Sequence, residues 1–496
     1  MEKLSPSSNW PVYGHEATRA IEKNLQARSA TPLMQSAGLA TARLAMALAP
    51  HAQRIWVAAG PGNNGGDGLE AALHLQRWGK SVQVSMINAK SGRPPEAQAA
   101  WLRAQAEGIQ LSHELPTLWL NQMSPLDLCV DALLGICSNR PLSPEMQNWV
   151  KAMNASKAQV LAIDCPTGLA PETGQALKDA GEAPIFVCAH HTLTFITAKP
   201  GLFMGHGRDA CGQIWLETLG HNPADCTETP QAWLNRQSPR PGKTHASHKG
   251  SHGDVAVIGG ESMSESSLGM TGAAVLAATA ALHAGAGRVF LSLLSGQTTH
   301  GLPPDLMQRA WQTLDLEHLY GVCGCGGGQS IGNVMPEVLL RSAHLVVDAD
   351  GLNAIAKDEA LQSLLAQRAN TQATVITPHP LEAARLLKCT TADVQSKRLK
   401  AAQDLASLFK CTVVLKGSGT VIAAPNQTPR INTSGNGLLA IGGTGDVLAG
   451  LIAARMAQGL EAFEAACSAV AQHGQIANDW PEARALTASR LASQLF

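Results

Sequence analysis

The sequence has no excess of charge of either sign, because 37 basic and 38 acidic residues give a net charge of −1. This balance argues against a nucleic acid or a membrane surface as partner, since both attract basic chains. The most apolar stretch, residues 272–287, is too short to cross a bilayer and contains His283. The first residues also lack the apolar core of a secretion signal. We therefore expect a cytoplasmic protein.

The sequence also lacks any C-x-x-C pair, although it contains 11 cysteines. Only Cys323 and Cys325 lie close together in the chain. Without paired cysteine or histidine knuckles, a structural zinc site is not expected. An odd number of scattered cysteines favours reduced thiols over disulfides.

With 496 residues, the chain is too long for one ordinary core, so two domains are expected. Apolar residues make up 45% and charged residues 15%, a globular composition. Proline and polar residues replace the hydrophobic pattern over residues 221–247. We interpret this segment as a linker between domains at residues 1–220 and 248–496.

The first half alternates between expected helices and strands, which predicts a parallel sheet. A buried strand at residues 54–60 runs into a turn rich in glycine and asparagine at 61–68, and a helix is predicted from 69 to 78. Further helices are expected at 15–25, 32–48, 96–107 and 145–153, and further strands at 81–87, 126–131, 159–164, 192–197 and 213–216. A turn of this kind after a strand is typical of phosphate-binding sites, although it matches neither G-x-G-x-x-G nor a P-loop.

Two of these strands end in an acid, Asp131 and Asp164. The carboxyl ends of parallel strands share one edge of the sheet, so both acids should lie beside the 61–68 turn. A single acid there often caps the next helix, but two around such a turn favour a binding site. Lys199 is a weaker candidate for the same edge.

A second alternation begins with a strand that ends at Gly259 and Gly260. Strands are expected at 288–294, 319–324, 344–348, 374–377 and 412–415, and helices at 269–284, 393–408, 462–475 and 482–494. The strand ends carry clusters of glycine, aspartate, histidine or lysine, which should converge on one edge. The predicted fold class is therefore α/β in both halves.

Residues 442–450 form the most distinctive motif of the second half, with three glycines in four positions, Asp446 and an apolar run. A glycine-rich turn that opens a helix points free N–H groups at one spot, which suits phosphate. An acid in the first turn is favoured by the helix dipole alone. The polar strand ends expected nearby favour a catalytic role for Asp446 instead.

Both halves carry motifs of known families. Residues 62–68, Asp131 and residues 164–169 resemble the NAD(P)H-hydrate epimerase domain, which is Rossmann-like. The second half resembles the ADP-dependent NAD(P)H-hydrate dehydratase, which is ribokinase-like, through residues 248–250, 259–260, 272–273, 347–353, 377–380, 416–420, Asn432, 435–436 and 442–446. The resemblance implies two three-layer αβα domains fused in one bifunctional repair enzyme.

The resemblance implies an isomerase and a lyase that act on NADH and NADPH hydrated at C6 of the nicotinamide ring. The first domain would interconvert the R and S epimers. The second would remove water from the S epimer with ADP, giving AMP and phosphate. Hydrated NADH and NADPH and ADP or AMP would be the partners, with no nucleic acid and no membrane, and we expect a homo-oligomer.

In the epimerase domain, the resemblance assigns Asp164 as the acid/base. Potassium would be bound by oxygen atoms of Asn64, Asp131 and Thr167, in line with its preference for oxygen ligands. The hydrate would contact Asn63, Asn64, Gly65, Gly66, Asp67, Gly135, Ile136, Cys137, Ser138 and Asp164.

In the dehydratase domain, the resemblance assigns Asp446 as the base that activates the ring hydroxyl. The N–H groups of Gly443, Thr444 and Gly445 would stabilise the transferred phosphoryl group. Ala273, Gly326, His379 and Asp446 would contact the hydrate, and Lys416, Gly417, Ser418, Gly419, Thr420 and Gly445 the nucleotide. Magnesium would accompany the nucleotide, with Asp348 or Asn353 as contacts through water.

The sequence departs from the family patterns at several points. Gly135-Ile136-Cys137-Ser138 replaces Gly-Thr-Gly-Leu, Thr167 replaces serine, and Cys325 replaces proline. Two alternatives stay open: a ribokinase-like kinase of small molecules, or a first domain that only binds nucleotides. The second expects loss of the strand-end acids, yet Asp131 and Asp164 are present.

Overall fold

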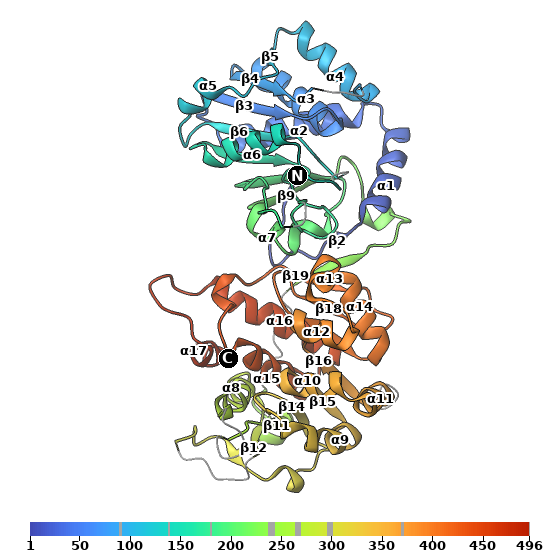
Figure 1. Ribbon diagram of the computed structural model, residues 1–496, viewed down its shortest axis with the longest axis vertical. Coiled ribbons are helices and arrows are strands. Elements are labelled where there is room, and N and C mark those ends of the chain that lie inside the picture. The colour runs from blue at the N-terminus through green and yellow to red at the C-terminus, as the bar shows by residue number, and fades with distance from the viewer. Residues whose placement is uncertain are drawn as a thin grey trace. The chain divides into compact units, whose positions relative to one another are not determined.

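The structure is a computed structural model that describes residues 1–88, 92–136, 139–178, 181–236, 244–262, 269–294, 301–368 and 372–495. It divides into two compact units (Figure 1). Unit 1 comprises Met1–Ser5 and Trp10–Trp233, and unit 2 comprises Pro6–Asn9 and Leu234–Phe496. Each unit is built around its own sheet, and each is described by itself below.

Unit 1 contains an eight-stranded sheet in which all neighbours are parallel except the first pair. The strand order is β1 (Glu2–Lys3), β9 (Gln213–Glu217), β8 (His191–Phe195), β7 (Gln159–Ile163), β6 (Leu128–Ala132), β3 (Arg54–Ala59), β4 (Ser81–Met86) and β5 (Gln110–Ser112). Alternate residues of β3 face opposite cores: Val57 packs on one side and Trp56 on the other. The unit therefore has three layers, with helices on both faces of the sheet.

The first face of this sheet is covered by α1 (His15–Arg28), α2 (Leu33–Leu48), α3 (Asn63–Arg77) and α4 (Pro95–Ala106). The second is covered by α5 (Thr117–Asn121) and α6 (Pro144–Ala155). A short α7 (Gly207–Ala210) precedes β9, and β2 (Pro11–Val12) pairs antiparallel with the start of β10 (Ala232–Asn235).

Unit 2 has a parallel sheet that ends in two antiparallel strands. The order begins with β13 (Met307–Gln308), β12 (Arg288–Leu293), β11 (Asp254–Gly259), β14 (Tyr320–Cys323), β15 (His344–Val347), β16 (Ala373–Ile376), β17 (Thr412–Leu415), β18 (Val421–Ala423) and β19 (Arg430–Asn432), and the sheet then continues into β10 and β2. Helices α8 (Thr271–His283), α15 (Thr444–Ala457), α16 (Ala462–Asn478) and α17 (Ala488–Ala492) share a core on one face.

The other face of this sheet carries α9 (Ile331–Arg341), α10 (Ala349–Lys357), α11 (Glu359–Gln367), α12 (Pro380–Leu387), α13 (Thr391–Ser396) and α14 (Arg398–Phe409). Both units thus confirm the predicted α/β class. Their parallel strands end at one edge of each sheet, where the strand-end residues singled out in the sequence are located.

Three helix predictions are corrected by the structure. Helix α3 begins at Asn63 rather than at residue 69, so most of the expected turn is helical. The glycines are tolerated there because the helix packs closely: a Cβ on Gly65 would lie 2.0 Å from Gly60 O. The expected helix at 393–408 is broken at Lys397, which has φ −141° and ψ 49°. The expected helix at 482–494 is limited to Ala488–Ala492.

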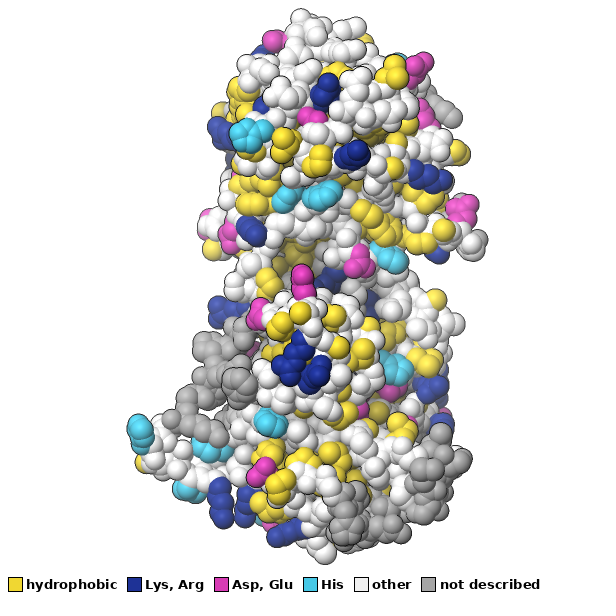
Figure 2. All heavy atoms as spheres, turned by 90° about the vertical axis from the view of Figure 1, so that its left-hand side faces the viewer, with side chains coloured by type: hydrophobic (Ala, Val, Ile, Leu, Met, Phe, Trp, Pro, Cys, Tyr) yellow, Lys and Arg dark blue, Asp and Glu magenta, His cyan; other side chains and the backbone are white. Residues whose placement is uncertain are grey.

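Basic and acidic side chains are interspersed on the face shown in Figure 2, in agreement with the balanced charge of the sequence. Among the described residues, no helix has the length and apolar character that a membrane span requires.

Candidate functional sites

Unit 1 has a cavity of about 310 Å³ at the carboxyl ends of its strands. It lies where the β3–α3 connection, the segment after β6 and the segment after β7 meet. Its walls include Asn63, Asn64, Asp67, Gly135, Ile136, Asp164 and Lys199. The structure thus brings together polar side chains that are up to 136 positions apart in the chain. A second cavity of about 680 Å³ shares Asn63 and Asp67 with it and extends beneath α1.

Asp164 is held in this cavity by a buried ion pair with Lys199. Lys199 Nζ donates to Asp164 Oδ1 at 2.6 Å, to Thr194 Oγ1 at 2.8 Å and to Phe195 O at 2.7 Å, so the ammonium group has three acceptors. Asp164 Oδ2 accepts from the N–H of Ile136 at 2.8 Å. Asp164 has φ 66°, a left-handed backbone that aspartate tolerates better than most residues. A strained, buried carboxylate with one face in a cavity is suited to proton transfer.

Asp131 is fully buried and binds Thr167 through both carboxylate oxygens. The Thr167 hydroxyl donates to Oδ1 at 2.7 Å, and its N–H donates to Oδ2 at 2.8 Å. Burial raises the pKa of Asp131 to about 6, although the hydrogen bonds from Thr167 lower it. No salt bridge joins Asp131 to another described residue, and a buried carboxylate beside a hydroxyl is a donor set that suits a hard cation.

The start of α3 places Asn63, Asn64 and Asp67 on the cavity wall. Asn63 Oδ1 and Asn64 Nδ2 are buried atoms that have no hydrogen-bond partner among the described residues. Burial and the nearby Asp164 carboxylate raise the pKa of Asp67 well above its usual value. Gly65 and Gly66, which were also predicted to contact the substrate, are buried against Gly60 and Met34. The unpartnered amide atoms indicate a ligand with both donors and acceptors.

Gly135 closes the wall opposite Asn64. A Cβ at this position would lie 3.1 Å from Asn64 Oδ1 and 3.1 Å from Asp164 Oδ2. The glycine therefore leaves space between the two polar groups. Two predicted substrate contacts in this loop, Cys137 and Ser138, lie outside the described residues.

In unit 2, Gly443 and Asp446 form the start of α15. Gly443 has φ 93° and is the N-cap, a conformation that glycine adopts without strain. His473 fixes the first turn: its Nε2 lies 3.0 Å from Thr444 O, and burial lowers its pKa to about 4, so the ring is neutral and donates to the carbonyl. The free N–H groups of this helix start are thereby aimed at the strand-end edge.

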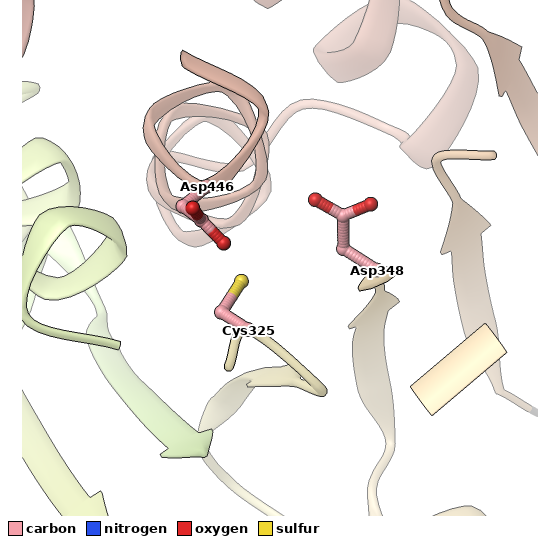
Figure 3. Close-up of side chains that lie close together, drawn as sticks. All are labelled: Cys325, Asp348 and Asp446. Carbon is pink, nitrogen blue, oxygen red and sulfur yellow. The ribbon is translucent and has the colours of Figure 1, made fainter. Parts of the chain in front are cut away.

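Asp446 faces Asp348 and Cys325 across this edge (Figure 3). One ligand atom from each of the three side chains lies within 4.8 Å of those of the other two. Burial, and then the Asp348 carboxylate, raise the pKa of Asp446 to about 6, while a hydrogen bond from Cys325 lowers it. Asp348 comes directly after β15 and Cys325 follows β14, so both are placed by parallel strands.

Lys416 follows β17 and completes this cluster. Its Nζ donates to Asp348 Oδ1 at 2.7 Å, and a Cβ on Gly445 would lie 3.2 Å from the same Nζ. Burial lowers the pKa of Lys416, but Asp348 and Glu382 outweigh it and raise the pKa overall. A permanent cation therefore lies beside the start of α15, next to a carboxyl group that is half ionised near pH 6.

His379 and Glu382 form a reciprocal cap at the start of α12. His379 Nδ1 accepts from the N–H groups of Leu381 and Glu382, and Glu382 Oε2 accepts from the His379 N–H at 2.8 Å. Burial lowers the pKa of His379 and raises that of Glu382 to about 7. The imidazole is therefore neutral, with Nε2 as its donor.

Two further predicted contacts of unit 2, Ala273 and Gly326, lie side by side. A Cβ on Gly326 would lie 2.9 Å from Ala273 Cβ, so these two predicted hydrate contacts are neighbours. Asn353 is less suited to a metal contact, because its Oδ1 accepts from Arg385 Nη1.

Arg398 is a functional candidate that the sequence reasoning missed. This buried side chain donates through Nη2 to Leu415 O, Lys416 O and Gly419 O, at 3.1, 3.2 and 3.3 Å. It therefore fixes the loop that carries Lys416 to Thr420. It escaped notice because it lies in an expected helix, where an arginine ordinarily faces solvent.

Comparisons with known proteins agree for the two units. Residues 255–496 match the NAD(P)H-hydrate dehydratase family, and residues 30–201 match the family of the YjeF-related protein N-terminus. The bifunctional NAD(P)H-hydrate repair enzyme of Escherichia coli is 34% identical over 492 residues, covering 94% of this chain and 88% of that protein. The chain belongs to the bifunctional NAD(P)H-hydrate repair enzyme family.

Other members of this family are similarly close. The repair enzyme of Leishmania braziliensis is 33% identical, covering 90% of this chain and 84% of its own. Among solved structures, an ADP/ATP-dependent NAD(P)H-hydrate dehydratase from Bacillus subtilis is 27% identical, with a TM-score of 0.43, and covers 52% of this chain and 92% of that one. The match to the whole-chain relatives spans both units, so membership does not rest on either unit alone.

Proposed function

We propose that this chain repairs NADH and NADPH hydrated at C6 of the nicotinamide ring. Unit 1 interconverts the R and S epimers. Unit 2 dehydrates the S epimer at the expense of ADP, giving NAD(P)H, AMP and phosphate. The observation that carries the proposal is Asp446: a carboxyl with a raised pKa lies beside Lys416 at a helix start, in a chain that belongs to this family.

In unit 2, Asp446 accepts the proton of the C6 hydroxyl as that oxygen attacks the β-phosphorus of ADP. The N–H groups at the start of α15 and the Lys416 ammonium stabilise the negative charge on the phosphoryl group. AMP leaves, and the C6–O bond then breaks with release of phosphate. Loss of a proton from C5 restores the ring double bond. Ala273, Gly326 and His379 hold the hydrate, and the 416–420 loop holds the nucleotide.

Magnesium supplies charge neutralisation to the nucleotide phosphates when it is bound. The acidic residues at the edge, Asp348 and Asp446, fit contacts to its water shell, since magnesium prefers oxygen ligands and keeps several waters. Asp348 also keeps Lys416 oriented through the ion pair at 2.7 Å.

In unit 1, Asp164 exchanges a proton with the hydrate, and Lys199 holds the Asp164 carboxylate in place through the ion pair at 2.6 Å. Asn63 and Asn64 have unpartnered amide atoms that fit the phosphates and ribose of the substrate. Asn64, Asp131 and Thr167 are proposed as potassium ligands, because all three offer oxygen atoms and Thr167 contacts the buried Asp131 carboxylate directly.

The direct test is to incubate the full chain with ADP and a mixture of the NADH hydrate epimers, while following NADH absorbance and AMP release. We expect NADH to form from both epimers, with one AMP for each NADH. A ribokinase-like kinase would instead leave the hydrates untouched. If intact protein gives no NADH with ADP or ATP, the proposal is wrong.

A further inference from the structure

Cys325 gives the edge of unit 2 a ligand type that the proposed chemistry does not use. Its side chain is fully buried, and Figure 3 shows its sulfur pointing at the Asp446 carboxylate. The resemblance described above leads one to expect proline at this position, and this chain has cysteine instead. Its Sγ and the carboxylates of Asp348 and Asp446 form the only group of potential metal-binding side chains of this size found among the described residues.

We propose that Cys325, Asp348 and Asp446 form a binding site for a thiophilic divalent cation such as Zn²⁺, and that its occupation blocks dehydration. The blocking step rests on the proposed function of Asp446, because a carboxylate that binds the metal no longer accepts a proton. Metal binding itself is independent of that function.

The geometry of the three side chains suits zinc. Zinc with one thiolate and two carboxylates needs ligand atoms about 3.5 Å apart, given Zn–S of about 2.3 Å and Zn–O of about 2.1 Å. The three ligand atoms already lie within 4.8 Å of one another, so shifts of about 1 Å close the site. One position of the tetrahedron remains for water, as in zinc sites with three protein ligands.

The charges of the cluster also favour a divalent cation. Burial, and then the Asp446 and Asp348 carboxylates, raise the pKa of Cys325 well above its usual value, so the thiolate forms only as a cation binds. The thiolate and the two carboxylates then carry three negative charges, and Lys416 supplies one positive charge at Asp348 Oδ1. A divalent cation therefore brings the group to neutrality. It also removes the repulsion between Asp348 and Asp446, which is one of the causes of the raised Asp446 pKa. Binding releases the thiol proton, so the affinity rises with pH.

The sulfur distinguishes this site from an ordinary magnesium site. Magnesium and calcium prefer oxygen ligands, whereas a thiolate selects zinc and similar metals. Zinc should therefore inhibit in the presence of excess magnesium. Inhibition should spare the epimerase reaction, because the three ligands all belong to unit 2.

The test uses Co²⁺ as a spectroscopic probe in the full-length protein. Bound to a thiolate, Co²⁺ gives a charge-transfer band in the near ultraviolet, and Zn²⁺ should abolish this band by displacing it. Cys325→Ser should lose the band and bind Zn²⁺ at least about tenfold more weakly, since even outer partners of metal ligands contribute that much. The matched control is Cys323→Ser: Cys323 is two residues away, and its Sγ contacts Met335 Sδ at 3.6 Å.

The activity arm measures Zn²⁺ inhibition of S-hydrate dehydration, relative to each variant's own zinc-free rate. The wild type and Cys323→Ser should be inhibited alike and rescued by a chelator, and Cys325→Ser should need at least about tenfold more zinc. Asp446→Asn should keep the cobalt–thiolate band and bind more weakly, a readout that needs no activity. The proposed metal site is wrong if the wild type shows no cobalt–thiolate band. It is also wrong if Cys325→Ser binds zinc as tightly as the wild type. If the wild type does not dehydrate the S epimer in the absence of zinc, the proposed function is wrong, but the cobalt measurement still tests metal binding.

Discussion

Lys199 Nζ donates to Asp164 Oδ1 at 2.6 Å, and this ion pair is almost completely excluded from solvent. The two residues lie 35 positions apart, one after β7 and one after β8. Burying such a pair without a function is costly, because the desolvation of two ions offsets much of their attraction. The pair is explained by its position, because Lys199 holds the Asp164 carboxylate in a fixed orientation beside the cavity.

The first prediction concerns the Asp164 carboxylate. Asp164→Asn should lower the rate at which the R epimer is consumed by at least about a hundredfold, because it removes the proton acceptor. Asparagine tolerates the φ of 66°, so the fold should be retained. Assays with each purified epimer check this, and dehydration of the S epimer should be unchanged. An exposed acid of the same unit gives the control Asp209→Asn. Equal consumption of R and S by Asp164→Asn would contradict the assignment.

The second prediction links Asp131 to pH and potassium. Its pKa is about 6 in the folded chain against an ordinary value of 3.8, so the folded state binds the proton more tightly. The free energy of unfolding should therefore fall by about 3 kcal/mol as the pH rises from about 4 to about 6, unless a cation compensates the charge. Potassium should stabilise unit 1 at about pH 8 and have little effect at about pH 4.

Thermal unfolding in potassium chloride and in choline chloride of equal ionic strength measures this difference. The control is Asp131→Asn, which keeps the shape of the side chain and removes the charge. It should lose the potassium effect. If potassium stabilises Asp131→Asn as much as the wild type, Asp131 is not a ligand of the cation.

The third prediction concerns the protonation of Asp446. Its pKa of about 6 means that the carboxylate is available above this pH and is lost below it. Dehydration should therefore fall about tenfold per pH unit below about pH 5, while it levels off on the alkaline side. Asp446→Asn should cost at least about a hundredfold in kcat and should flatten this acid limb. The epimerase rate of the same protein is the internal control. If dehydration by Asp446→Asn still falls at low pH, the group that titrates is not Asp446.

The fourth prediction uses two neighbouring glycines at the start of α15. A Cβ on Gly443 would lie 2.7 Å from Leu276 Cδ1 and 2.9 Å from Ala488 Cβ, and its φ is 93°. Gly443→Ala should therefore cost about 1–3 kcal/mol of stability and lower kcat/KM of dehydration, because the N–H groups shift. Gly442→Ala is the matched control, since nothing lies within 4 Å of its Cβ. Similar losses in both variants would argue against a specific role for the Gly443 conformation.

The sequence predicted the strand ends better than it predicted the helices. Short apolar runs precede Asp131, Asp164, Asp348 and Lys416. Parallel strands bring their carboxyl ends to one edge of the sheet, even when the first residue of each strand is predicted wrongly. Helix boundaries depended on packing that no local pattern encodes. Helix α3 starts within the glycines because Gly65 and Gly66 fit against Gly60 and Met34, a close approach that outweighs their poor helix propensity.

Partners between distant residues were also beyond the sequence. The pairing of Lys199 with Asp164 required the crossing from β7 to β8, and the cluster of Cys325 with Asp446 required the order of the sheet. Supporting residues were hardest to find, because they carry no motif. His473 donates to one backbone carbonyl and Arg398 to three, and each looks like an ordinary helix residue in the sequence.

The last prediction tests Arg398 as a positioning residue for the nucleotide loop. Its guanidinium binds the carbonyls of Leu415, Lys416 and Gly419, so Arg398→Met removes these three hydrogen bonds and frees the loop to move. The KM for ADP should rise by at least about tenfold, because an ordered loop must then be formed on binding, while kcat should change less. Steady-state kinetics with varied ADP measures both values.

Arg398→Lys should rescue little, because one ammonium cannot reproduce the planar fork. The control Arg341→Met removes a half-buried arginine that pairs with Glu337 on α9, and it should leave the KM unchanged. A general loss of stability would lower kcat with the amount of folded protein and spare the KM, so an unchanged KM in Arg398→Met would show that this residue supports the fold and not the nucleotide site.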